Sequence, residues 1–209
     1  GFMEFVEALE DELKEKYAGI EENLSLFAGI QLPQTGETLT EDDSDRFLEY
    51  LTEVPDGVIR MCEDIDMVQT SLNLGILRLA GNVMTADYAL RSSVGEEKKE
   101  LVERLTRIAD AYEGNTSAFG DYPAWEYVKE SPFREKAVNV FRSLYGRDPV
   151  VTGVHAGLEC GILAEKVEGL EAISIGPNIK DIHTTKEKLD LKSAERTWTY
   201  ILKLLEKQC

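Results

Sequence analysis

The chain has 209 residues, of which 43% are hydrophobic and 30% charged, so it can form a globular core in one domain or two small ones. The formal net charge is −17, and residues 1–66 carry most of it, with 19 acidic and 4 basic side chains. Binding to nucleic acid or to an anionic membrane needs clustered lysine and arginine, so the composition argues against both partners.

The three cysteines are widely spaced, which favours free thiols in a reducing compartment. The sequence shows no charged and then apolar leader, and no apolar run of the roughly 18 residues that a membrane crossing needs. We therefore expect a soluble protein in the cytoplasm.

The first third of the chain predicts helices and one short strand. Apolar residues recur every three or four positions from Phe2 to Tyr17, which indicates an amphipathic helix. A short strand is expected at residues 24–28. Thr40 followed by Asp43 fits a capping box, which predicts the start of a helix there.

The middle of the chain predicts a hairpin and a helix. Residues 69–79 and 83–92 have strand-like composition and are separated by Ala80, Gly81 and Asn82, which favours an antiparallel hairpin. Residues 96–112 then return to helical spacing. These elements predict a small antiparallel sheet covered by helices on one face, an α+β arrangement.

Periodicity is lost between Gly114 and Pro132, and we place a domain boundary there, so that residues 1–115 and 116–209 form separate domains. The second domain is expected to alternate strands and helices, as α/β folds do. Its expected elements are a helix from Val138 to Tyr145, a strand at 150–154, a helix at 158–167, a strand at 172–175 and a last helix capped by Ser193.

Both histidines of the chain follow these two expected strands. His155 comes directly after the strand at 150–154, and His183 lies in the loop after the strand at 172–175. Ligand sites in open α/β sheets form at the carboxyl ends of strands. The sequence therefore predicts that a ligand site, if the chain has one, includes this region.

Several short motifs in this order resemble one family. They are TSLNLG at 70–75, ALRSSV at 89–94, YPAW at 122–125, HAGLECG at 155–161, and ISIGP at 173–177 followed by His183 and Glu187. Together they resemble the aminoacyl-histidine dipeptidases, which are carnosinase-like dinuclear zinc exopeptidases. The resemblance covers most of the chain from Met67 onward. It departs from the family pattern at Thr184, Thr185 and Lys186, where the family usually has Ser-Pro-Asp.

The resemblance implies that residues 1–115 are part of a lid domain, which serves dimerisation and substrate contact, and that residues 116–209 are the C-terminal segment of a catalytic domain. Members of the family begin with a catalytic half that carries the other metal ligands and a Glu-Glu pair. We expect that half to precede this chain in a longer protein. The longer protein would hydrolyse Xaa-His dipeptides with water activated by two zinc ions, and the chain alone would be inactive.

The resemblance also suggests site residues, although none of them is expected to be catalytic. His183 matches the last zinc ligand, Arg91 and Asn82 match lid positions that contact the peptide, and the motif with His155 and Glu159 faces the cleft. The residues themselves leave other interpretations open. His183 could be an exposed loop residue, Arg91 a surface ion-pair partner, His155 a buried and hydrogen-bonded histidine, and Glu159 a helix cap.

Four more polar residues carry weaker signals. Cys160 could be a nucleophile beside His155, but no Asn or Asp partner is evident, and a small buried cysteine fits better. Asn73 could simply shape a β-bulge. Asp181 and Glu187 could orient His183 or be solvated. A second function is a non-catalytic interaction module, in which the lid pairs with another lid.

Overall fold

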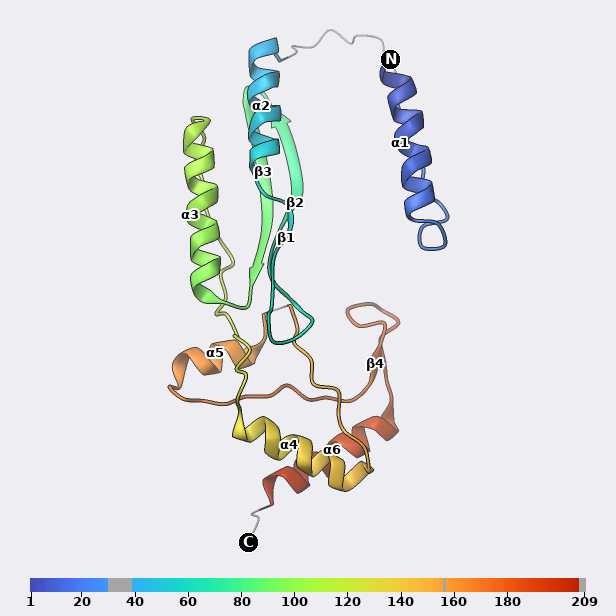
Figure 1. Ribbon diagram of the computed structural model, residues 1–209, viewed down its shortest axis with the longest axis vertical. Coiled ribbons are helices and arrows are strands. Elements are labelled where there is room, and N and C mark those ends of the chain that lie inside the picture. The colour runs from blue at the N-terminus through green and yellow to red at the C-terminus, as the bar shows by residue number, and fades with distance from the viewer. Residues whose placement is uncertain (30–38, 156, 207–209) are drawn as a thin grey trace. The chain divides into compact units, whose positions relative to one another are not determined.

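The computed structural model describes residues 1–29, 39–155 and 157–206. It divides into two compact units, Gly1–Asp43 and Ser44–Cys209, which are considered separately. The described residues form six helices, a three-stranded antiparallel sheet and a two-stranded ladder (Figure 1). This mixture of helices with a small antiparallel sheet confirms the predicted fold class. Among these residues, no helix combines the length and the apolar character that a membrane crossing requires.

The first unit contains the predicted N-terminal helix, α1, at Phe2–Lys16. The predicted strand at residues 24–28 is wrong, because these residues form neither helix nor strand, and the Phe27 side chain is 94% exposed. A strand is stabilised by hydrogen bonds to a neighbouring strand. The described residues of this unit supply no such neighbour.

Helix α2 (Glu41–Glu53) begins where the capping signal places it. The Thr40 Oγ1 atom accepts a hydrogen bond from the Asp43 backbone N–H at 3.1 Å and donates to Asp43 Oδ2 at 2.8 Å. Strand β1 (Gly57–Met61) follows and was not predicted. All five of its residues are exposed, so it lacks the apolar alternation by which strands are recognised.

Strands β2 (Val68–Ala80) and β3 (Val83–Ser92) form the predicted hairpin, and the sheet order is β1-β2-β3. Gly81, at the first position of the two-residue turn, has φ +57°, a conformation that glycine adopts without steric cost. A bulge interrupts the β2–β3 register between Leu74 and Ile76.

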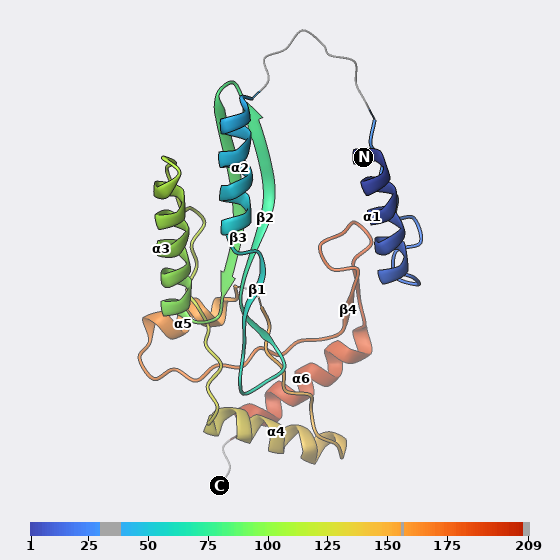
Figure 2. The same cartoon turned by 45° about the horizontal axis from the view of Figure 1, so that its top comes forward.

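One face of the hairpin packs against α2 and α3 (Gly95–Ala111), which Figure 2 shows beside the sheet. Leu72 of β2 is completely buried at the centre of this layer. The buried cluster consists of Val54, Leu72, Leu101 and Ile108, with Tyr50, Tyr88, Leu90, Leu105 and Tyr112 packed around it. Apolar burial between sheet and helices therefore holds this part of the chain together.

A buried polar network fixes the start of α3 to all three strands. Thr70 of β2 and Ser92 of β3 share a hydrogen bond of 2.8 Å, and Thr70 also donates to Glu97 of α3. The other oxygen of Glu97 accepts from Arg60 of β1 at 2.6 Å and from Gln69 of β2 at 2.7 Å. Because every polar group here has a partner, the network specifies how α3 meets the sheet.

The C-terminal part contains α4 (Pro132–Tyr145), α5 (Glu159–Lys166) and α6 (Leu191–Leu205). Helices α4 and α6 pack together through Ala137, Val140, Tyr200 and Leu204. The Tyr200 hydroxyl donates to the Ala137 carbonyl at 2.8 Å, so this buried polar group is satisfied. Residues 113–131 contain no helix or strand, and the domain boundary placed there stays a prediction.

Three predictions for this part are corrected by the structure. The strands expected at 150–154 and 172–175 are absent, because these apolar segments have no neighbouring strand among the described residues. The observed ladder is instead β4 (Ile179–Lys180) with β5 (Lys188–Leu189). The cap of α6 is Asp190 rather than Ser193, since Asp190 Oδ1 accepts from the Ser193 N–H at 3.1 Å.

Replacing Leu72 with alanine should lower the free energy of unfolding of the chain by about 2–5 kcal/mol, because it opens a cavity in a completely buried position. Leu79→Ala is the matched control on the same strand, since Leu79 is 50% exposed, and it should change the free energy by about 0.5 kcal/mol or less. Urea unfolding followed by circular dichroism measures both values. Equal losses would contradict the placement of the core.

Candidate functional site

The second face of the β2–β3 hairpin carries the polar residues of the candidate site. Side chains alternate between the faces of a strand, so Ser71 and Arg91 point away from the face that holds Leu72. Ser71 and Arg91 are direct partners across the two strands. The end of the sheet thus presents a hydroxyl and a guanidinium side by side.

His155 docks on this pair with both its side chain and its backbone. The imidazole Nε2 lies 2.7 Å from the Ser71 hydroxyl oxygen, and the Arg91 Nη1 group donates to the His155 carbonyl at 3.3 Å. Ser71 and Arg91 are 84 and 64 residues from His155 in the sequence. The two contacts therefore join the sheet to the HAGLECG segment, in which Ala156 lies outside the described residues.

The environment of His155 favours the neutral imidazole. Partial burial lowers its pKa most, and the positive charge of Arg91 lowers the pKa further. A neutral imidazole can donate from one nitrogen and accept at the other. His155 can therefore hold the Ser71 hydroxyl and still offer a second hydrogen bond.

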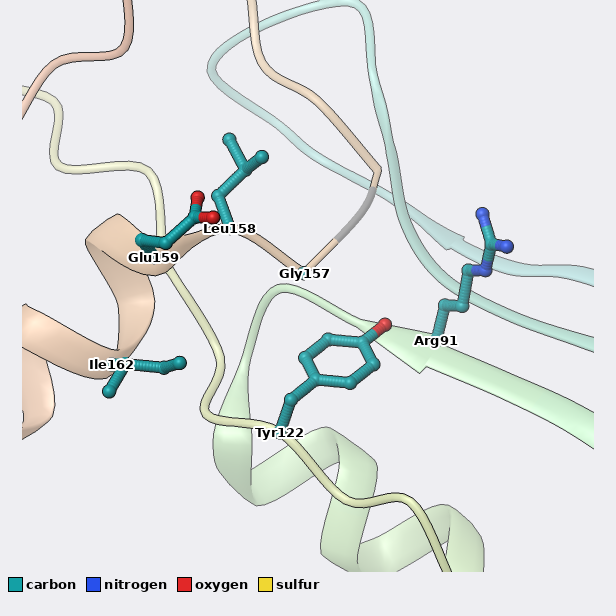
Figure 3. Close-up of a pocket in the computed structure, with 6 residues that line it drawn as sticks. All are labelled: Arg91, Tyr122, Gly157, Leu158, Glu159 and Ile162. Carbon is teal, nitrogen blue, oxygen red and sulfur yellow. The ribbon is translucent and has the colours of Figure 1, made fainter. Parts of the chain in front are cut away.

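An open depression of about 360 Å³ lies beside this junction (Figure 3). It is lined by Arg91, Tyr122, Gly157, Leu158, Glu159 and Ile162. Its volume is within the range of small-molecule sites. Arg91 is a cation and Glu159 an anion, so the lining can accommodate a ligand that carries both charges.

Tyr122 and its neighbours were not singled out individually by the sequence reasoning, although the YPAW motif contained the signal. Lys98 of α3 donates to Asp121 Oδ1 and to the Tyr122 carbonyl, both at 2.6 Å. Ser71 was also missed, even though it belongs to the TSLNLG motif. A serine in a strand has no distinctive pattern, so only the fold reveals its contact with His155.

Asn82 lies at the far end of the hairpin. It occupies the turn that precedes β3, whereas Arg91 lies near the other end of that strand. A strand of this length spans about 30 Å. One small ligand therefore cannot touch Asn82 and Arg91 of the same chain. Asn73, further along the sheet, is exposed, pairs with Ala89, and precedes the bulge at Gly75.

His183 is exposed in the loop between β4 and β5. Its backbone has φ +64°, and Asp181 has φ +53° in the same loop. The His183 N–H donates to Glu187 Oε2 at 2.9 Å, so Glu187 orients the backbone of His183. A catalytic zinc ion takes three protein ligands. In residues 1–29, 39–155 and 157–206 no group of three or more His, Cys, Asp or Glu side chains could hold a metal ion, so His183 does not form a zinc site by itself here.

Cys160 is half-buried at the start of α5, next to Glu159. The Glu159 carboxylate makes no hydrogen bond with any residue that the structure describes, and Leu158 is the capping position of the helix. Glu159 lies in the first helical turn, where a negative charge interacts favourably with the helix dipole.

No family model matches the chain. The chain is 30% identical over 203 residues to the cytosol non-specific dipeptidase of Escherichia coli K12, and the alignment covers 97% of the chain but 41% of that enzyme. The crystal structure of aminoacylhistidine dipeptidase from Vibrio alginolyticus matches with a TM-score of 0.86 at 25% identity, covering all of the chain and 43% of that enzyme. The predicted family resemblance is confirmed. This chain is similar to a C-terminal portion of these dipeptidases and spans about two fifths of their length.

A more distant match shares the fold alone. The aminopeptidase PepT of Bacillus cereus has a TM-score of 0.57 at 17% identity over 78% of the chain, which is 44% of that protein. The match to the Vibrio alginolyticus structure covers the whole chain. It therefore includes the hairpin, the Tyr122 segment and the HAGLECG segment, which meet at the candidate site.

The pKa of His155 should lie below about 6.5, the ordinary value for histidine, and it should rise in Arg91→Met, because that change removes the neighbouring positive charge. Arg78→Met removes a cation from the distant half of β2 and is the matched control. Proton NMR titration of the two histidines measures this, and His183→Ala assigns the signals. A pKa that does not respond to Arg91→Met would contradict the Arg91–His155 contact.

Proposed function

We propose that the chain is the C-terminal portion of a zinc-dependent dipeptidase of the cytoplasm, which hydrolyses Xaa-His type dipeptides. The observation that carries the proposal is the match of the whole chain to an aminoacylhistidine dipeptidase, with a TM-score of 0.86. The E. coli relative is a cytosolic dipeptidase, which supports both the reaction class and the compartment. Peptide hydrolysis would then take place in a longer protein to which this chain contributes part of the site.

In this proposal the depression beside Arg91 is the substrate-contacting part of the chain. Arg91 would bind a substrate carboxylate through parallel N–H groups, a geometry that suits guanidinium. Glu159 would face a cationic group of the same substrate. His155 would position the loop between them, because its carbonyl and imidazole are already held by Arg91 and Ser71.

His183 would contribute one metal ligand, and the preceding half of the longer protein would contribute the others. The exposed imidazole of His183 supports this proposal. Exposed apolar surface that the preceding half would cover supports it as well. On α6 the Trp198 side chain is 62% exposed, and Leu202 and Leu205 are exposed beside it. Large apolar patches of this kind usually mark an interface.

A homodimer formed through the lid is part of the same proposal. Within the described residues β3 pairs only with β2, so its outer edge is open. Ile76, Leu77, Leu79 and Val83 expose apolar surface near the tip of the hairpin. An open strand with apolar side chains is prone to pair with another chain. Asn82 lies at this tip, so it would contact substrate held by the second copy rather than by its own.

A non-catalytic interaction module is the second candidate function, and the open β3 edge is the observation that favours it. The two functions differ in their need for metal. A dipeptidase loses activity when zinc is removed, whereas a lid that pairs with another lid does so with or without zinc. Dimerisation through the lid is expected of both functions, so zinc-dependent cleavage of a dipeptide by the longer protein is the measurement that separates them.

The purified 209-residue chain should not cleave Ala-His even with added zinc, whereas the longer protein should cleave it. The reason is ligand number, since the described residues contain no complete metal site. Release of free histidine, measured by chromatography, checks both proteins under the same conditions. Zinc-dependent cleavage by the chain alone would refute the proposed division of ligands. If the longer protein binds no zinc and cleaves no dipeptide, the interaction module is favoured.

In the longer protein, His183→Ala should lower kcat/KM by more than about 100-fold, because loss of even an indirect metal contact costs about 10- to 100-fold. Its thermal stability should hardly change, since His183 is an exposed loop residue. Thr185→Ala in the same loop is the control and should keep its activity. Zinc content measured by atomic absorption must fall in His183→Ala only. A variant that keeps both its zinc and its turnover would show that His183 is not a ligand.

A further inference from the structure

Tyr122 is the lining residue whose position is fixed most completely by the rest of the fold. It lies in the segment 113–131, which has no helix or strand. Lys98 holds this segment from one side through its hydrogen bonds of 2.6 Å to Asp121 Oδ1 and to the Tyr122 carbonyl. The Lys98 ammonium also lies 5.7 Å from the centre of the Tyr122 ring, in the range of a cation–π interaction. The Lys98 side chain is only 20% exposed, whereas its partner Asp121 is 79% exposed, so only the Lys98 end of this brace is shielded from solvent.

The Tyr122 ring also lies against the HAGLECG segment. A Cβ atom added to Gly157 would come within 2.7 Å of Tyr122 Cδ2, which is closer than real contacts allow. A Cβ at Gly161 would likewise lie 2.9 Å from the Pro123 carbonyl oxygen. The two glycines let the start of α5 approach the Tyr122 segment closely. The ring is therefore in contact with both the Lys98 ammonium and the backbone at Gly157.

The ring lies between the two charged residues of the depression. In Figure 3 Tyr122 lies between Arg91 and the side formed by Leu158, Glu159 and Ile162, and all five residues line the depression. A ligand that reaches from Arg91 to Glu159 therefore passes the Tyr122 ring. The hydrogen bonds of Lys98 hold the backbone at Tyr122, and turning the ring aside would also give up the cation–π contact with Lys98 and the close packing against Gly157.

We propose that Tyr122 is a specificity-determining residue, whose braced ring limits the size of the dipeptide side chain that the depression admits. Lys98 is its positioning residue. This inference rests on the proposed dipeptidase function and deepens it by assigning the size limit to one ring. A rigid aromatic wall discriminates by volume, and one extra or missing methylene group in an apolar pocket changes kcat/KM by about 10- to 200-fold.

The test compares substrates that differ only in the size of one side chain. Ala-His and Trp-His vary the first residue, and His-Ala and His-Trp vary the second. In the longer protein, Tyr122→Ala should raise the ratio of kcat/KM for the tryptophan dipeptide to that for the alanine dipeptide by about tenfold or more in at least one pair. Lys98→Met should shift the same ratio in the same direction by a smaller factor, because the ring remains but its brace is lost.

Tyr122→Phe is the matched control, since it keeps the ring, and it should leave both ratios unchanged. Thermal unfolding shows whether each variant is folded. If Tyr122→Ala does not fold, the ratios measured for Lys98→Met test the inference instead. Dissociation constants from calorimetry on the metal-stripped protein should show the same change in ratio, which excludes an effect on turnover alone. Cleavage with ratios unchanged in Tyr122→Ala and Lys98→Met would overturn this inference and leave the dipeptidase intact. If the unaltered longer protein neither binds nor cleaves any of the four dipeptides, the proposed function fails, and this inference fails with it.

Discussion

The arrangement of the candidate site depends on the alternation of side chains along the β2–β3 hairpin. Leu72 is buried against α2 and α3, so its neighbour Ser71 must face the other way, together with its cross-strand partner Arg91. A shift of one residue in register would exchange these faces. The burial of one leucine thus fixes where a hydroxyl and a guanidinium meet His155. The Thr70–Ser92–Glu97 network holds the same register from the side of α3.

Helices, strands and turns whose own residues show a characteristic pattern could be predicted from the sequence. The hairpin, the six predicted helices and the Thr40 cap depend on local alternation, helical spacing and turn chemistry, and all are present among the described residues. The segments 150–154 and 172–175 are different, because β-branched composition gives a strand only where another strand accepts its hydrogen bonds. No such neighbour lies among the described residues. Strand β1 was not predicted for the opposite reason. Its hydrogen bonds to β2 make it a strand, whereas its own exposed residues carry no strand pattern.

Three of the five residues suggested for the site lie close together in the structure, and their roles stay predictions. The motifs pointed to Arg91, His155 and Glu159, and the structure brings Arg91 into contact with His155 and Glu159 into the same lining. Separation along one strand could have shown from the start that Asn82 lies too far from Arg91 for a common ligand. Ser71, Lys98 and Tyr122 join the site through contacts between distant segments, and such contacts leave no trace in residue spacing.

At position 183 the backbone conformation and the proposed role of the side chain favour different residues. A φ of +64° lies in the left-handed region, which glycine occupies without steric cost and which asparagine, aspartate and histidine occupy more often than other residues do. Asp181 lies in the same region, so the turn adopts this conformation at two positions within three residues. Glycine at position 183 would suit the turn best, whereas the proposed metal ligand requires an imidazole there. If His183 is the proposed ligand, this position gives up some stability of the turn in exchange for ligand chemistry.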